Sequence, residues 1–232
     1  MVTIDVPRAS ATQEVELAPE DDQRQLLKVR PDLSKSFRLS LGIPIVVPLT
    51  AKQVSGSKPI TDFFNAHKEN RFFLVRLATS FASPNAEPVT RAWLKVGLKA
   101  GKAQAMVIAM DPMQISKESE VKQSVKDGIS LKMFGATLGF ESTRETTAPQ
   151  GDLFMTAHGL QTASAGWELR ETGKLKIGGA FAFDLIVRTA DKETVGRIQA
   201  MVEVRRKLLG LISYKSKLDE HPTGKFLLPK SK

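Results

Sequence analysis

Hydrophobic side chains alternate with polar ones over residues 174–188. The apolar parity consists of Leu175, Ile177, Gly179, Phe181, Phe183, Leu185 and Val187. A period of two places successive side chains on opposite faces of a strand. The pattern therefore predicts one long β-strand with a buried face, and the neighbouring Gly178 and Gly179 indicate a bulge or a close backbone approach.

Shorter alternating runs occupy much of the remaining chain. They span residues 37–47, 73–81, 92–100, 103–110, 129–133, 153–157, 164–170 and 198–204. Residues typical of turns separate them, as in Ser83–Pro88 and Glu171–Gly173. This succession of short strands, without βαβ repeats, predicts a mainly β protein with an antiparallel β-sandwich, one or two short helices and flexible termini. We expect Trp167, Phe181 and Phe183 in its core.

Three segments allow helical structure. A helical turn capped by Thr61 would hold Phe63 and Phe64, and the polar residues 115–126 suit either a short helix or a strand. Residues 194–211 also fit an amphipathic helix. We favour a strand as far as Val204, followed by a short helix or irregular chain over residues 207–211.

The distribution of charge suggests three regions along the chain. Residues 1–34 form an acidic, flexible arm with space for a short helix, residues 35–214 form the β-sandwich, and residues 215–232 form a basic tail. Within this tail, Phe226, Leu227 and Leu228 could dock as a further strand.

Composition excludes several kinds of chemistry. The 232 residues include no cysteine, so disulfides, thiolate metal sites and cysteine nucleophiles are ruled out. The beginning of the sequence lacks the pattern of a signal peptide, and no apolar run is long enough for a membrane-spanning helix. We therefore expect a cytoplasmic protein of bacterial or phage origin.

Residues that could support catalysis or bind a metal are few. His67, His158 and His221 have no metal-binding spacing, and the sequence leaves open whether His67 and His158 converge. No nucleophile elbow, phosphate-binding loop or dinucleotide-binding glycine motif is present. The acidic pair Glu118 and Glu120 lies in a polar segment that would not shift a pKa. We predict no catalytic, cofactor-binding or metal-binding residues, and no enzyme activity.

Positive charge offers the remaining functional signal, because the formal net charge is +9. The candidate interaction residues are Trp93, Lys95, Lys99, Lys174, Lys176, Arg188, Arg205, Arg206 and Lys207. If their strands are neighbours, the lysines and arginines would form a cationic face. Alternatively, they are a charged surface that protects sheet edges from aggregation, and Trp93 caps a second sheet.

These observations favour a non-catalytic protein-interaction or sensor module that acts through a sheet face or edge. Its partner would be another protein or a second copy, with the acidic arm and the basic tail supporting head-to-tail association. One alternative, suggested by the positive charge, is nucleic-acid or polyanion binding. It would lack sequence specificity because no recognition helix is evident, and the 6% of aromatic residues leave little for base stacking. Another is a pore-forming protein whose hairpins 93–110 and 175–204 enter a membrane after a conformational change.

Overall fold

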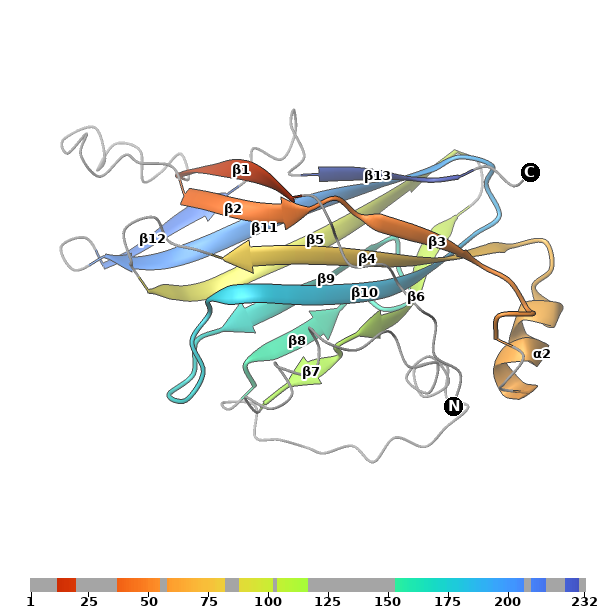
Figure 1. The fold of residues 1–232 in the computed structure, drawn as a ribbon, viewed down its shortest axis with the longest axis horizontal. Helices are drawn as coiled ribbons and strands as arrows, with labels where there is room; N and C mark the ends of the chain where they lie inside the picture. The colour runs from red at the N-terminus through yellow and green to blue at the C-terminus, as the bar shows by residue number, and fades with distance from the viewer. Residues whose placement is uncertain are drawn as a thin grey trace.

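The structure is a computed structural model that describes residues 12–19, 37–54, 58–81, 88–101, 104–116, 153–206, 210–215 and 224–229. These residues form two antiparallel sheets that face each other, with one short helix, α2 (Lys58–Ala66), at one end (Figure 1). The predicted mainly β, sandwich-like architecture is confirmed.

The first sheet, which we call the β4 sheet, is built around the long strands β4 and β10. Its strand order is β6–β10–β4–β2–β1, and β3 pairs with β4 beyond the end of β2. Its strands are β1 (Thr12–Pro19), β2 (Phe37–Gly42), β3 (Ile45–Leu49), β4 (Arg71–Phe81), β6 (Ala105–Asp111) and β10 (Gly179–Thr189).

The second sheet, the β5 sheet, is built around β5 and β11. Its strand order is β12–β11–β5–β9–β8–β7, and β13 pairs with β11 next to β12. Its strands are β5 (Val89–Ala100), β7 (Gln114–Ile115), β8 (Met155–His158), β9 (Ser164–Arg170), β11 (Thr194–Arg206), β12 (Gly210–Lys215) and β13 (Gly224–Leu228).

The two sheets are joined along both sides. On one side β1 pairs with β2 and also with β12, where Ala18 lies opposite Lys215. On the other side Val107 of β6 bonds to the turn before β9: its amide donates to Thr162 O at 2.9 Å, and its carbonyl accepts from Gln161 N at 2.7 Å. Residues 12–19, which we expected in a flexible acidic arm, therefore form a paired strand.

The core lies between the sheets and contains the three residues expected there. Trp167, Phe181 and Phe183 are buried, with the Trp167 and Phe183 ring centroids 4.8 Å apart. Trp167 Nε1 donates to the carbonyl of Pro112 at 2.8 Å, which satisfies the one polar group that its burial removes from water.

The close backbone approach predicted at Gly178 and Gly179 occurs instead at Gly166 of β9, where a Cβ would overlap the carbonyl of Leu94 in β5. Gly179 has φ of 83°, a conformation that favours glycine, but within the described structure no atom of another segment lies within 4 Å of the position of a Cβ there. A third glycine is approached closely by a side chain. At Gly196 of β11, a Cβ would overlap the ring of Phe226 from β13. Gly196 therefore provides the space in which β13 buries Phe226.

Several predicted elements differ in extent. β10 begins at Gly179, although Leu175 and Ile177 before it are still buried. The single strand expected over residues 37–47 is two strands, β2 and β3, separated by the exposed Ile43 and by Pro44, which lacks an amide donor for a ladder. Phe226 and Leu228 do dock as part of β13, as expected.

Two alternatives are resolved by strand pairing. Residues 194–206 form β11, so the amphipathic-helix alternative is wrong there. Of residues 207–211, expected as a short helix or irregular chain, the described residues 210 and 211 are strand, because β12 begins at Gly210. The expected hairpins are also wrong. β5 and β6 belong to different sheets, and so do β10 and β11, so neither consecutive pair forms a ladder. The predictions for residues 117–126 and 129–133 lie outside the described residues.

Candidate interaction face

Side chains on the outer face of the β5 sheet carry most of the candidate interaction residues. We call this surface the basic face. It includes Arg91, Trp93, Lys95, Lys99, Glu168, Arg170, Arg197, Met201, Glu203, Arg205, Lys225 and Leu227. They share a face because their neighbours in sequence, such as Leu94, Leu169 and Val202, point into the core. Lysine and arginine clearly outnumber acidic residues on it.

The strand register sets the centre of the basic face. Trp93 of β5 lies opposite Glu168 of β9 on one side and Met201 of β11 on the other. At the preceding outward position of β5, Arg91 lies between Arg170 of β9 and Glu203 of β11. A half-buried aromatic ring is thus surrounded by charged and flexible side chains.

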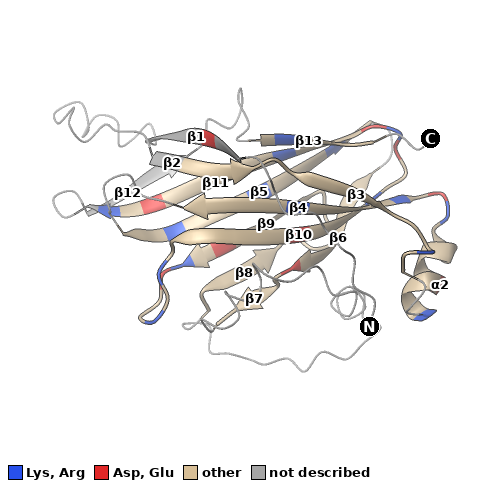
Figure 2. Ribbon diagram, in the orientation of Figure 1, with Lys and Arg blue, Asp and Glu red and all other residues tan. Residues whose placement is uncertain are grey.

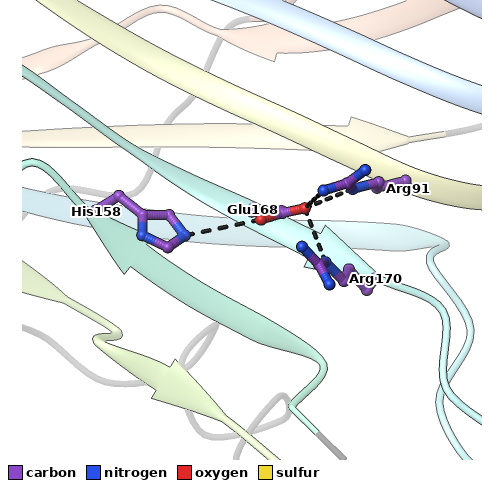
Figure 3. A network of polar contacts seen from close by, with 4 residues as sticks. All are labelled: Arg91, His158, Glu168 and Arg170. Carbon is purple, nitrogen blue, oxygen red and sulfur yellow. Dashed lines mark hydrogen bonds and ion pairs between the residues drawn. The ribbon is translucent and has the colours of Figure 1, made fainter. Parts of the chain in front are cut away.

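Glu168 holds two arginines together (Figure 3). Glu168 Oε1 accepts a hydrogen bond from Arg170 Nε at 2.8 Å and bonds from Arg91 through Nε and Nη2. His158 of β8 lies on the other side of the carboxylate, with Nε2 at 3.8 Å from Oε2. Without Glu168, Arg91 and Arg170 would be like charges directly opposite each other, an unfavourable cross-strand pair.

The arginines also control the charge of Glu168. Burial by itself would raise the pKa of this carboxyl, but the hydrogen bonds from Arg170 and Arg91 lower its pKa below the ordinary value. Glu168 therefore remains ionised at neutral pH, with a side chain only 12% exposed. The network keeps a net positive charge because two guanidinium groups share one carboxylate.

Arg91 also covers the aromatic ring at the centre of the face. Its Cζ lies 4.2 Å from the centroid of the Trp93 ring, within the range of a cation–π interaction. Trp93 is half-buried on the outer face, so it is a surface residue, as predicted, but one face of its ring is already occupied. Base stacking on this side of the ring would require Arg91 to move.

An exposed apolar residue extends the basic face toward β13. Leu227 is 70% exposed and lies opposite the half-buried Val195 of β11. The adjacent outward residue of β13 is the exposed Lys225. Aromatic residues, methionine and arginine beside exposed apolar side chains are typical of protein–protein interfaces.

The predicted interaction residues do not all meet on this surface. Trp93, Lys95, Lys99 and Arg205 lie on the basic face. Arg188 lies on the outer face of the opposite sheet, where Nη2 is 3.0 Å from Met106 Sδ. The condition for a single cationic stripe, that the strands carrying these residues are neighbours, is therefore not met by β5 and β10.

The remaining candidates lie elsewhere. Lys174 and Lys176 belong to the connection between β9 and β10, and Lys176 forms an ion pair with Glu171. The side chain of Arg206 and the whole of Lys207 lie outside the described part of the chain.

Sequence reasoning missed the partners that organise the face: His158, Glu168, Arg170, Arg197 and Lys225. Alternation around the buried Trp167 does place Glu168 and Arg170 outward. What alternation cannot provide is the register that brings β9 beside β5. Without that register, the sequence gives no reason to connect Glu168 with Arg91.

The outer face of the β4 sheet is different, because α2 and the turn after β3 pack on part of it. Phe64 of α2 stacks on Phe72 of β4 with ring centroids 4.1 Å apart, and Ile60 is buried beside them. Figure 2 shows β4 and β10 without charged residues over most of their length. The covered part of the sheet therefore has a second, smaller hydrophobic core.

Next to this second core lies a row of three charged residues from adjacent strands. Arg76 Nε and Nη2 donate to the two carboxylate oxygens of Asp184 at 2.8 and 2.6 Å, and these side chains are only 11% and 5% exposed. Asp111 of β6 lies opposite Asp184. Burial, and then repulsion by Asp184, raises the pKa of Asp111 to about 6, although Arg76 opposes the shift. Burial also raises the pKa of Asp184.

Neither face contains an evident metal site. The described residues include no group of three or more His, Cys, Asp or Glu side chains placed to hold a metal ion. His67 and His158 have different neighbours: His67 Nδ1 lies 2.9 Å from the carbonyl of Phe63, and His158 approaches Glu168. Within the described residues, no helix is long and apolar enough to cross a membrane.

Comparison with known proteins gives only distant likenesses. No protein-family model and no curated protein matches the chain. Among solved structures, a pore forming protein matches with a TM-score of 0.35 and 9% identity, covering 96% of this chain and 94% of that one. Clostridium perfringens delta-toxin matches with a TM-score of 0.30 and 6% identity, covering 97% of this chain and 94% of that one. The collagen binding domain of Erysipelothrix rhusiopathiae surface protein RspB matches with a TM-score of 0.29 and 10% identity, covering 97% of this chain and 58% of that one. TM-scores this low carry no argument about function.

Proposed function

We propose that this protein is a non-catalytic binding module whose basic face receives an acidic surface of another protein. The observation that supports this is the composition of the basic face. Exposed Lys95, Lys99 and Arg197 share it with the half-buried Trp93 and the exposed Leu227. Charge complementarity would guide encounter, and the apolar side chains would provide area that loses water on binding.

The mixture of side chains favours a protein partner over a nucleic acid. A polyanion backbone needs only positive charge and gains nothing from Leu227. A single strand would also use aromatic rings for base stacking, yet Trp93 is covered on one side by Arg91. An acidic protein surface with some apolar residues would use both components of the face.

We place binding on the face because charged and apolar side chains meet there, whereas strand addition at an edge uses a row of unpaired backbone groups. In the described residues, β1 is bonded to strands of both sheets and Val107 of β6 to the turn before β9, while β3 and β13 each pair with one strand. The one described helix packs on the β4 sheet, so it does not cover the basic face.

The test is binding of defined probes by fluorescence anisotropy. Two short labelled peptides of equal charge are compared, one alternating glutamate with leucine and the other alternating glutamate with serine, together with single-stranded DNA. We expect the glutamate–leucine peptide to bind most tightly, with affinity that decreases as salt increases. Stronger binding of DNA than of either peptide would instead support the polyanion alternative.

Matched charge variants show which surface binds. Lys95→Gln with Lys99→Gln removes two positive charges from the basic face. Lys58→Gln with Lys68→Gln removes two exposed positive charges in and just after α2. We expect the first pair to weaken peptide binding by about fivefold and the second by less than about twofold, because screened charges act mainly over short distances. Equal losses in both would contradict the proposal.

A further inference from the structure

The Arg91–Glu168–Arg170 network has more donors than its carboxylate uses. A guanidinium group has five N–H donors in a planar fork. Arg170 donates to Glu168 through Nε, and Arg91 through Nε and Nη2. In the described structure, both terminal nitrogens of Arg170 and Nη1 of Arg91 have no hydrogen-bond partner. These groups are accessible, because the side chains are 59% and 36% exposed.

Glu168 holds the two guanidinium groups at one carboxylate oxygen. Arg91 and Arg170 lie directly opposite each other on neighbouring strands, and both bond to the same oxygen of Glu168. The stack on Trp93 further restricts Arg91. Two flexible side chains are thus ordered before any ligand arrives, which reduces the entropy lost on binding.

We propose that Arg91 and Arg170 form a clamp for a carboxylate of the acidic protein partner, with Glu168 as the residue that positions them. This inference rests on the proposed function and names the point of recognition within the basic face. The planar guanidinium fork matches a carboxylate in two-point hydrogen bonding, which a lysine ammonium cannot reproduce. A carboxylate bound there would become the second counter-ion of a network that has two cations and one anion.

A purely electrostatic face and a positioned clamp predict opposite effects for one substitution. Glu168→Gln makes the face more positive, so general electrostatics predicts tighter binding of an anionic peptide. The clamp predicts weaker binding, because the charge-assisted hydrogen bonds that order the two arginines are lost. We expect an affinity loss of about tenfold for the glutamate–leucine peptide, the size typical of a lost hydrogen bond to a charged group.

Glu203→Gln is the matched control. Glu203 lies opposite Arg91 on β11, is half-buried like Glu168, and makes no side-chain hydrogen bond or ion pair to either arginine in the described structure. Its replacement removes the same negative charge from the same face and leaves the clamp intact. We expect this variant to bind the peptide as tightly as the wild type, or up to about threefold more tightly.

Arg170→Lys tests the fork without a change of charge. We expect it to weaken peptide binding by about fivefold or more, because an ammonium group cannot form the two-point contact. Lys68→Arg, just after α2 and away from the basic face, should leave affinity unchanged. Near-ultraviolet circular dichroism of each variant reports whether the fold is retained, and Arg170→Lys provides a second measurement if Glu168→Gln is unstable.

The outcomes separate the clamp from the proposed function. If the Lys95 and Lys99 pair matters but Glu168→Gln binds as tightly as Glu203→Gln, the clamp is overturned and the binding face stands. If Arg170→Lys binds like the wild type, the clamp is likewise overturned. If the wild type binds no acidic peptide, or binds it independently of the basic face, both proposals fail.

Discussion

The two outer faces of this sandwich hold their charges in different ways. On the β4 sheet, Arg76 and Asp184 are almost fully removed from water and satisfy each other through two hydrogen bonds. On the β5 sheet, Arg170 shares Glu168 with Arg91 and is more than half exposed. Buried pairs are costly to break, whereas exposed pairs contribute little to stability. Breaking the Arg76–Asp184 pair should therefore reduce stability, whereas the Arg91–Glu168–Arg170 network keeps hydrogen-bond donors accessible to a partner.

The largest difference between the faces should appear when one cation is removed from each. Arg76→Met leaves the buried Asp184 and the half-buried Asp111 without the one cation that the described structure places beside them. We expect it to lower the free energy of unfolding by about 3–5 kcal/mol, measured by urea denaturation. Lys95→Met on the basic face should change it by less than about 0.5 kcal/mol. Similar losses in the two variants would remove the contrast between the faces.

The helix that covers the β4 sheet provides a second comparison. Phe64→Ala removes the ring that stacks on Phe72 and opens the smaller core. We expect a loss of about 3 kcal/mol in the free energy of unfolding, at the lower end for a buried phenylalanine because the site is close to the surface. Leu227→Ala, at the exposed apolar position of the other face, should change stability by less than about 0.5 kcal/mol. A marked loss in Leu227→Ala would show that this leucine is covered in solution.

Lowering the pH should change the stability contributed by the two faces in opposite directions. The pKa of Asp111 is about 6 in the folded protein and 3.8 ordinarily, so the folded state binds the extra proton between these values. Asp111 therefore makes the free energy of unfolding decrease as pH rises from about 4 to 6, and its destabilising effect is complete above about pH 7. The lowered pKa of Glu168 acts the other way: its contribution is present above its unfolded pKa and is lost as pH falls through its folded pKa.

Asp111→Asn tests this sign. It should raise the free energy of unfolding at about pH 8 by about 2–3 kcal/mol and have little effect near pH 4. Glu168→Gln should instead lower stability at neutral pH, since an ionised partner of two arginines is lost. Chemical denaturation of both variants across this pH range provides the measurement. An Asp111→Asn variant that is less stable than the wild type at high pH would contradict the assignment.

The smallest effect concerns the arginine over the tryptophan. A double-mutant cycle with Arg91→Ala and Trp93→Ala should give a coupling of about 0.5–1 kcal/mol, as expected for a partly exposed cation–π pair. The corresponding cycle for Lys99 and Trp93, which lie three outward positions apart on β5, should give no measurable coupling. Equal couplings would indicate a general effect of charge on the face.

Alternation in the sequence predicts most strands and their buried faces, because both depend on neighbours within one strand. It correctly places Trp167 and Phe183 inside and Trp93 outside. It does not predict which strands pair, since pairing depends on contacts between distant segments. For that reason the predicted cationic stripe combined Lys95 with Arg188, which lie on opposite sheets, and omitted Arg170. β1 was missed because its acidic residues suggested a solvated arm.

The position of β1 also affects the order in which this protein can be assembled during synthesis. Ala18 and Pro19 pair with Lys215 and Tyr214, which the ribosome adds almost two hundred residues later. β5 similarly waits for β11, its longest partner. A growing chain can therefore pair strands β1 through β4 early, but β6 joins this sheet only when β10 emerges, and the side that β1 closes stays open until β12 emerges. During that interval the nascent protein presents unpaired strand edges, the feature that chaperones and aggregation both recognise.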